Sequence, residues 1–217
     1  MINLETLFWV MVVFFALIGT LRGWTKEAIA MAGLMLSLFA LNLASSTSLI
    51  NLLIDTSVDV TVLTDTTILA NYNSDLPVDT VNATAIATLQ REFYVLVAIH
   101  LVIAFFAYQG PTLAGGRVGE RLRVRDSVQN WLLGMLLGGV NGYLIFGTLW
   151  SFLEYRITVA GSPRLAAGYN YAFYPMIQRP LEPFALQILE YLPLPMLSPF
   201  LPYLIVGMFL FVIIVFI

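Results

Sequence analysis

The sequence predicts an all-α fold, a polytopic transmembrane helical bundle with about five spans. Of the 217 residues, 59% are hydrophobic and only 11% are charged, whereas an ordinary soluble domain is roughly 25% charged. The mean hydropathy is +0.87, and the apolar residues gather in long runs that polar stretches separate. So little charge cannot cover a soluble surface. We therefore predict a single integral membrane domain over residues 1–217.

The five predicted spans cover residues 6–21, 27–44, 92–109, 131–153 and 200–217. A helix needs about 20 apolar residues to cross a bilayer, and the last run is short enough to be either a span or a re-entrant segment. Two long connections, 45–90 and 156–199, separate the spans. The first is rich in Asp and Thr but lacks the alternate spacing of a calcium loop. The second is rich in Pro and Tyr, which suit a membrane interface.

A charged turn joins the first two apolar runs and contains Arg22, Gly23, Lys26 and Glu27. A charged turn with glycine between two apolar runs predicts a helical hairpin in the bilayer. We expect Thr25 to cap the second helix, with Glu27 in its first turn, where the helix dipole favours a carboxylate. We also expect Arg22 to pair with Glu27 across the turn.

The fourth apolar run carries the strongest packing pattern of the sequence. Gly134, Gly138 and Gly142 are four residues apart, so they lie on one face of a helix and allow another helix to approach closely. Asn141 borders this ridge and can donate a polar contact across it. The partner helix could belong to the same chain or to another one. Structural packing is therefore the expected role of these four residues, together with Arg22, Gly23 and Glu27.

The absence of cysteine and the scarcity of histidine exclude several kinds of chemistry. The chain has no cysteine, which excludes disulfides, thiolate metal sites and thiol nucleophiles. Its one histidine, His100, leaves few options for a metal site or a catalytic triad, so we expect no metal and no enzyme activity. His100 lies near the middle of the third span. It would make a structural hydrogen bond to a neighbouring helix or ligate a pigment or haem, although the sequence requires no cofactor.

The distribution of charge predicts the orientation in the membrane. A second charged turn follows the third span and contains Arg117, Arg121, Arg123 and Arg125, which we expect to lie against anionic lipid headgroups. Short, dense basic loops face the cytoplasm, so both turns and the C-terminus should be cytoplasmic and the N-terminus outside. No cleavable signal peptide is evident. The net charge of −3 gives no indication of nucleic-acid binding.

In one stretch of the sequence, an acidic residue precedes a hydrophobic helix, a small residue, Arg-Gly and a basic-Glu-Ala continuation. These positions are Glu5, Gly19, Arg22-Gly23 and Lys26-Glu27-Ala28. This stretch and a second one resemble the colicin V production (CvpA-type) family of bacterial inner-membrane proteins.

The second stretch of the resemblance has a polar pair, two apolar residues and then glycines four apart. The matching positions are Asn130-Trp131, Gly134, Gly138 and Asn141-Gly142. Glu5, Asn130, Trp131 and Asn141 differ from the Asp, Asp, Arg and Arg of the family pattern. The resemblance implies a non-enzymatic membrane protein with a role in secretion or envelope homeostasis and a place in the bacterial inner membrane.

Two other functional classes remain open. The first is an accessory structural subunit of a larger respiratory or photosynthetic complex, which would explain the apolar surface. Its partners would be membrane lipids and either other transmembrane subunits or a second copy of the chain, bound through the glycine ridge. A channel or transporter needs polar residues at membrane depth. The spans offer little of this kind apart from His100, Asn42 and Asn141, so this class is the weaker alternative.

Overall fold

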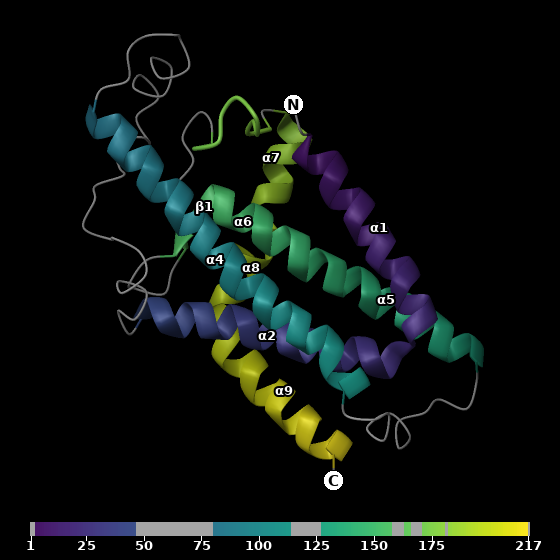
Figure 1. Cartoon of the computed structure of the whole chain (residues 1–217). Coiled ribbons are helices and arrows are strands. Elements are labelled where there is room, and N and C mark those ends of the chain that lie inside the picture. The colour runs from purple at the N-terminus through teal and green to yellow at the C-terminus, as the bar shows by residue number, and fades with distance from the viewer. Residues whose placement is uncertain are drawn as a thin grey trace. The chain divides into compact units, whose positions relative to one another are not determined.

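The computed structural model of the chain describes residues 3–46, 80–113, 127–157, 163–165, 171–180 and 182–216. Helices make up most of the described residues, which confirms the predicted helical fold (Figure 1). They are α1 (Leu4–Arg22), α2 (Trp24–Ser46), α4 (Thr80–Leu113), α5 (Ser127–Gly142), α6 (Thr148–Glu154), α7 (Pro183–Glu190), α8 (Pro193–Leu197) and α9 (Leu201–Phe216). A π-helical turn, η4 (Tyr143–Gly147), joins α5 to α6, and a 3-10 turn, η5 (Ser198–Phe200), precedes α9.

Five stretches of the described chain are long and apolar enough to cross a membrane. They are Leu4–Arg22, Trp24–Leu43, Ile86–Gly110, Val128–Glu154 and Pro183–Leu210. The chain is therefore a multi-pass integral membrane protein. The first four overlap the predicted spans, and the third begins six residues earlier than predicted, at Ile86.

The structure corrects three of the predicted boundaries. The fifth candidate span begins at Pro183, within the predicted connection, because α7, α8, η5 and α9 follow one another with short breaks. Helix α4 continues through Gly110 and Pro111 to Leu113, where we expected the third span to end by residue 109; a proline near a helix end removes only one hydrogen bond of the last turn. Helix α2 begins at Trp24, so Thr25 lies inside the helix and does not cap it.

One short antiparallel hairpin lies after the fourth span. Strand β1 (Tyr155–Ile157) pairs with β2 (Pro163–Leu165), with Arg156 opposite Arg164. The sequence did not predict these strands. Most of the predicted acidic connection, residues 47–79, lies outside the described residues.

The contacts within the chain divide it into two compact units. The first comprises Met1–Leu7, Asn42–Ala98 and Leu149–Ser198, and the second comprises Phe8–Leu41, Ile99–Thr148 and Pro199–Ile217. The boundaries fall within α1, α2, α4, α6 and η5, and each unit is made of three separate segments. The predicted single domain stays a prediction, and each unit is described by itself.

A single residue connects α1 to α2 in the second unit. Gly23 has a φ of 81°, a left-handed conformation that glycine adopts without the steric cost of a Cβ atom. Its N–H donates to the carbonyl of Gly19 (3.0 Å), and its own carbonyl accepts from the N–H of Glu27 (3.3 Å). One helix therefore ends and the next begins within one turn, which fixes the side chains on both sides of Gly23 relative to each other.

The glycines of α5 pack against α1 within the same unit, and the two helices run side by side in Figure 1. A Cβ atom added at Gly138 would collide with the carbonyl oxygen of Phe15 and lie 2.9 Å from the Cα of Gly19. A Cβ atom at Gly134 would collide with the carbonyl oxygen of Gly19. At Gly142 it would lie 2.8 Å from the Cβ of Phe15. The partner of the ridge is thus a helix of the same chain.

Two adjacent glycines of α5 allow a matched test of this packing. Gly138→Ala should lower the free energy of unfolding by about 1–3 kcal/mol, because the backbone of α1 must move away from the new methyl group. Gly139→Ala should be neutral or stabilising by up to about 1 kcal/mol, since its Cβ atom would meet only the Cβ of Ala16 at 3.6 Å. Thermal unfolding in detergent measures both variants. Equal melting temperatures would contradict the assigned α1–α5 contact.

Candidate functional site

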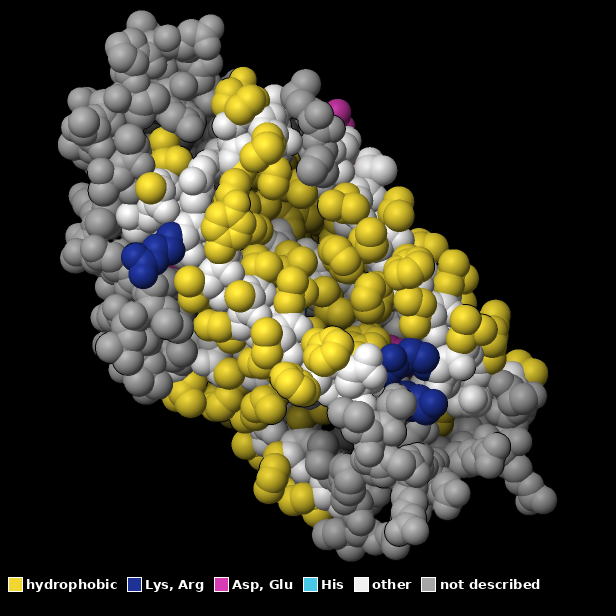
Figure 2. All heavy atoms as spheres, viewed as in Figure 1, with side chains coloured by type: hydrophobic (Ala, Val, Ile, Leu, Met, Phe, Trp, Pro, Cys, Tyr) yellow, Lys and Arg dark blue, Asp and Glu magenta, His cyan; other side chains and the backbone are white. Residues whose placement is uncertain are grey.

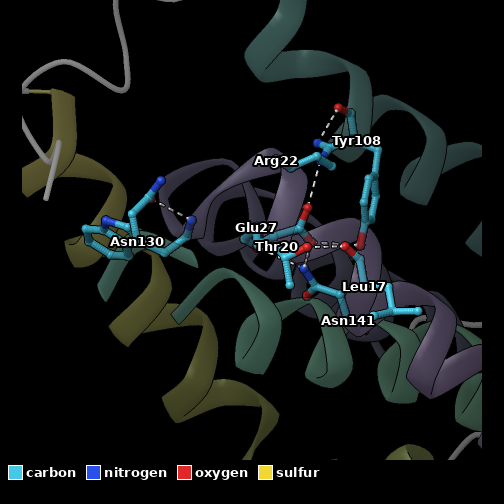
Figure 3. A network of polar contacts seen from close by, with 8 residues as sticks. Leu17, Thr20, Arg22, Glu27, Tyr108, Asn130 and Asn141 are labelled. Carbon is cyan, nitrogen blue, oxygen red and sulfur yellow. Dashed lines mark hydrogen bonds and ion pairs between the residues drawn. The ribbon is translucent and has the colours of Figure 1, made fainter. Parts of the chain in front are cut away.

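The most conspicuous polar cluster of the second unit surrounds Glu27, whose side chain is fully buried. Arg22 is the last residue of α1, and Glu27 lies in the first turn of α2. The Arg22 Nε lies 2.7 Å from the Glu27 Oε1, and the arginine side chain is 25% exposed (Figure 3). The one-residue turn at Gly23 places the two charges beside each other. An isolated carboxylate would be very unfavourable in an apolar interior, and this pairing neutralises it.

Two further helices contribute donors to the second oxygen of Glu27. The Tyr108 hydroxyl of α4 donates to Oε2 (3.1 Å), and so does the Asn141 Nδ2 of α5 (2.8 Å). Asn141 Nδ2 also lies 2.9 Å from the backbone carbonyl of Glu27. Both carboxylate oxygens therefore have a partner. The cluster joins α1, α2, α4 and α5 at one point (Figure 3).

Arg22 makes its other contacts with Tyr108. Its Nη2 donates to the Tyr108 carbonyl (3.0 Å), and its guanidinium carbon lies 4.5 Å from the centre of the tyrosine ring. This distance is within the range of a cation–π interaction. Arg22 thus binds Glu27 and the end of α4 together, a task that suits a planar side chain with several donors.

Asn130 of α5 contacts the start of α2. Its Oδ1 accepts a hydrogen bond from the backbone N–H of Trp24 (3.3 Å), one of the first N–H groups of a helix, which lack a partner within the helix. A Cβ atom on Gly23 would lie only 2.9 Å from the same oxygen. Asn130 therefore acts as a cap supplied by a distant helix, and it needs a glycine at position 23.

His100 forms a separate polar contact in the second unit. Its Nδ1 lies 2.8 Å from the Ser37 hydroxyl oxygen of α2, and both side chains have no exposed surface. This geometry is a hydrogen bond between neighbouring helices, one of the two roles that we considered for His100.

A second buried carboxylate lies in the first unit. Glu154, at the end of α6, has no exposed surface, and Arg179 Nε donates to both of its oxygens at 3.0 Å. Nearby, the Trp150 Nε1 donates to the Tyr171 hydroxyl (2.9 Å). Hydrogen bonding to Glu154 raises the pKa of Arg179, and burial raises the pKa of Tyr171. At neutral pH Arg179 is therefore positively charged and the Tyr171 phenol is neutral.

The polar content of the spans was underestimated. We expected the spans to offer few polar residues apart from His100, Asn42 and Asn141. The structure also buries polar or charged side chains at Thr25, Glu27, Ser37, Glu92, Thr148, Ser151 and Glu154. Thr25 and Glu27 belong to the charged turn that we predicted, whereas Thr148, Ser151 and Glu154 recur at every third residue of an apolar run and were missed. Tyr108 and Arg179 gave no such indication, because an aromatic residue and a loop arginine are ordinary at an interface.

The predicted site residues fall into three groups. The structure brings Arg22, Gly23, Glu27, Asn141 and the glycines of α5 together in one packed region. His100 lies elsewhere, beside Ser37. The predicted lipid-interface residues lie outside the described residues: Arg117, Arg121, Arg123 and Arg125. Among the residues that the structure describes, no group of three or more His, Cys, Asp or Glu side chains could hold a metal ion.

No protein-family model, curated protein or solved structure matches the chain.

The pairing of Arg22 with Glu27 can be tested through stability. Arg22→Ala leaves a buried carboxylate without its counter-charge and should cost about 3 kcal/mol, at the lower end of the range for a broken buried pair because Arg22 is partly exposed. Adding Glu27→Gln should recover a large part of this loss, since an amide needs no counter-charge. Melting temperatures and membrane levels of the single and double variants measure the coupling. Additive effects of the two substitutions would refute it.

The Trp150–Tyr171 hydrogen bond gives a second prediction, for the first unit. Tyr171→Phe should lower the free energy of unfolding by about 1–3 kcal/mol, because the buried Trp150 N–H loses its acceptor. Tyr203→Phe removes the same hydroxyl from a side chain that is 77% exposed and should have no measurable effect. The measurement is thermal unfolding in detergent. An unchanged melting temperature for Tyr171→Phe would show that the bond does not stabilise the fold.

Proposed function

We propose that this chain is a non-enzymatic integral membrane protein of the colicin V production type, with a role in secretion or envelope homeostasis. The proposal places it in the bacterial inner membrane. It also places the Arg22–Lys26 turn on the cytoplasmic side, together with the C-terminus, and the N-terminus outside. The Arg22–Glu27 cluster and the glycine ridge serve as its structural core.

One observation carries the proposal. The two stretches that resemble the family are more than a hundred residues apart in the sequence, yet they meet in the second unit. Gly19 and Gly23 of the first stretch lie against Gly134 of the second. Glu27 of the first accepts a hydrogen bond from Asn141 of the second. A chance likeness of two short patterns gives no reason for them to be in contact, whereas a shared packing core does.

Two of the four positions that differ from the family pattern, Asn130 and Asn141, keep polar contacts. Asn130, where the family has Asp, caps the N–H of Trp24. Asn141, where the family has Arg, donates to Glu27. A neutral amide at each position preserves a hydrogen bond while the Arg22–Glu27 pair supplies the charge. This supports a common core with altered polar partners.

We propose a non-enzymatic role because of the way in which the polar cluster around Glu27 holds its carboxylate. Glu27 is held by an ion pair with Arg22 on one oxygen and by hydrogen bonds from Tyr108 and Asn141 on the other. Its side chain has no exposed surface, whereas a general base must come within hydrogen-bond reach of the substrate proton that it removes. Packing and positioning are the tasks that such a cluster performs well.

Deletion of the gene in its host tests the proposed role. The deletion strain should admit a dye that the intact envelope excludes, or should secrete less of a peptide toxin. The wild-type gene and Gly207→Ala should restore both, since a Cβ atom at Gly207 meets nothing within 4 Å. Gly138→Ala should restore the dye barrier and toxin secretion less well, in proportion to its lower level in the membrane.

Two results would count against the role. A deletion strain with an intact barrier and normal secretion would overturn it. Recovery of the protein in a large native particle with defined companion subunits would favour the accessory-subunit alternative instead.

A further inference from the structure

An apolar groove lies between three helices of the second unit. It has a volume of about 370 Å³ and is lined by Ile29, Gly33 and Leu36 of α2, Phe106 and Gly110 of α4, and Met208 of α9, among others. All six residues belong to stretches that are long and apolar enough to span a membrane. The medium outside the groove is therefore the hydrocarbon of the bilayer, which makes a lipid acyl chain the occupant of matching chemistry.

The groove is large enough for part of an acyl chain. Its volume of about 370 Å³ is near the lower limit of small-molecule sites, about 300–1,000 Å³. A methylene chain that lies along α2 fits this space.

Lys26 stands at one end of the same face of α2. It is exposed and precedes Gly33 by seven residues, or nearly two full turns, so the two residues share one face of the helix. The groove reaches Gly110 at the end of α4. That end of α4 is held beside the turn by the bond from Arg22 Nη2 to the Tyr108 carbonyl. The groove thus begins where the basic residues of the turn are.

The end of α2 favours an anion for two reasons. The Lys26 stem can follow apolar surface while its ammonium reaches the headgroup level. The N-terminus of the helix adds a partial positive charge at the same place. Figure 2 shows hydrophobic side chains over much of the visible surface, with Lys and Arg side chains confined to small separate groups. Arg22 and Lys26 are the described basic residues of the second unit.

We propose that the groove and Lys26 form a binding site for an anionic phospholipid. One acyl chain lies between α2, α4 and α9, and the phosphate of the headgroup pairs with the Lys26 ammonium. The site rests on the membrane-spanning helices alone, so its failure would leave the proposed cellular role unaffected.

Native mass spectrometry of the purified protein tests the headgroup half of the site. The probes are phosphatidylglycerol and phosphatidylcholine with identical acyl chains. The wild-type chain should retain the anionic lipid several-fold better than the zwitterionic one. Lys26→Gln should abolish this preference. Arg91→Gln removes one exposed cation from the other unit and should leave the preference unchanged. An unaltered preference in Lys26→Gln would overturn the proposal.

A pair of substitutions on α9 tests the groove half. Met208→Trp fills the groove and should reduce retention of both lipids several-fold. Val206→Trp adds the same indole on α9 at a position that does not line the groove, and it should have no effect. If Met208→Trp lowers the melting temperature, Ala32→Phe fills the groove from α2 in its place. Equal retention by a well-folded groove-filling variant and Val206→Trp would overturn the assignment of the groove.

Discussion

The carboxylate of Glu27 imposes the strongest constraint on the second unit. Its side chain has no exposed surface, and a bilayer offers no water to solvate a charge. Every partner must therefore come from the protein: Arg22 of α1 supplies the counter-charge, and Tyr108 of α4 and Asn141 of α5 donate hydrogen bonds. This requirement fixes more than one contact: Tyr108 sets the rotation of α4 about its axis, and Asn141 sets that of α5. A small rotation of either helix would leave a buried polar atom unpaired, at a cost comparable to a lost hydrogen bond.

The close approach of α1 and α5 follows from the same turn. Since only Gly23 separates α1 from α2, α1 cannot move away from α5 without displacing Arg22 from Glu27. Glycines on both helices remove the side chains that would otherwise keep the backbones apart. Packing of this kind replaces the hydrophobic driving force, which is absent between helices in lipid. The ion pair and the glycine contact are therefore mutually dependent.

The sequence predicted the parts of this arrangement that are local. Apolar runs located the spans, the spacing of Arg22 and Glu27 around a glycine suggested their pairing, and glycines four apart defined a face of α5. It could not predict which helix covers that face, because a glycine ridge specifies close approach and not the identity of its partner. The Glu154–Arg179 pair was missed because the two residues lie 25 positions apart across a proline-rich connection, where no periodicity applies. The fifth candidate span begins earlier than we predicted because prolines at the first turns of α7 and α8 begin helices.

A buried ion pair is weak evidence for stability, because removing two charges from a polar environment can cost as much as their attraction returns. The value of the Arg22–Glu27 pair lies in specificity: an apolar turn would let α1 and α2 pack in several rotations, and a charged one permits few. Neighbouring residues on a helix point about 100° apart. With Glu27 turned inward to Tyr108 and Asn141, Lys26 must therefore project away from the cluster. The inward carboxylate is matched by donors of the protein, and the outward ammonium lies at the end of an apolar groove. The first turn of α2 thus organises the interior of the unit and, by the same geometry, determines which face of the helix carries a positive charge toward the lipid.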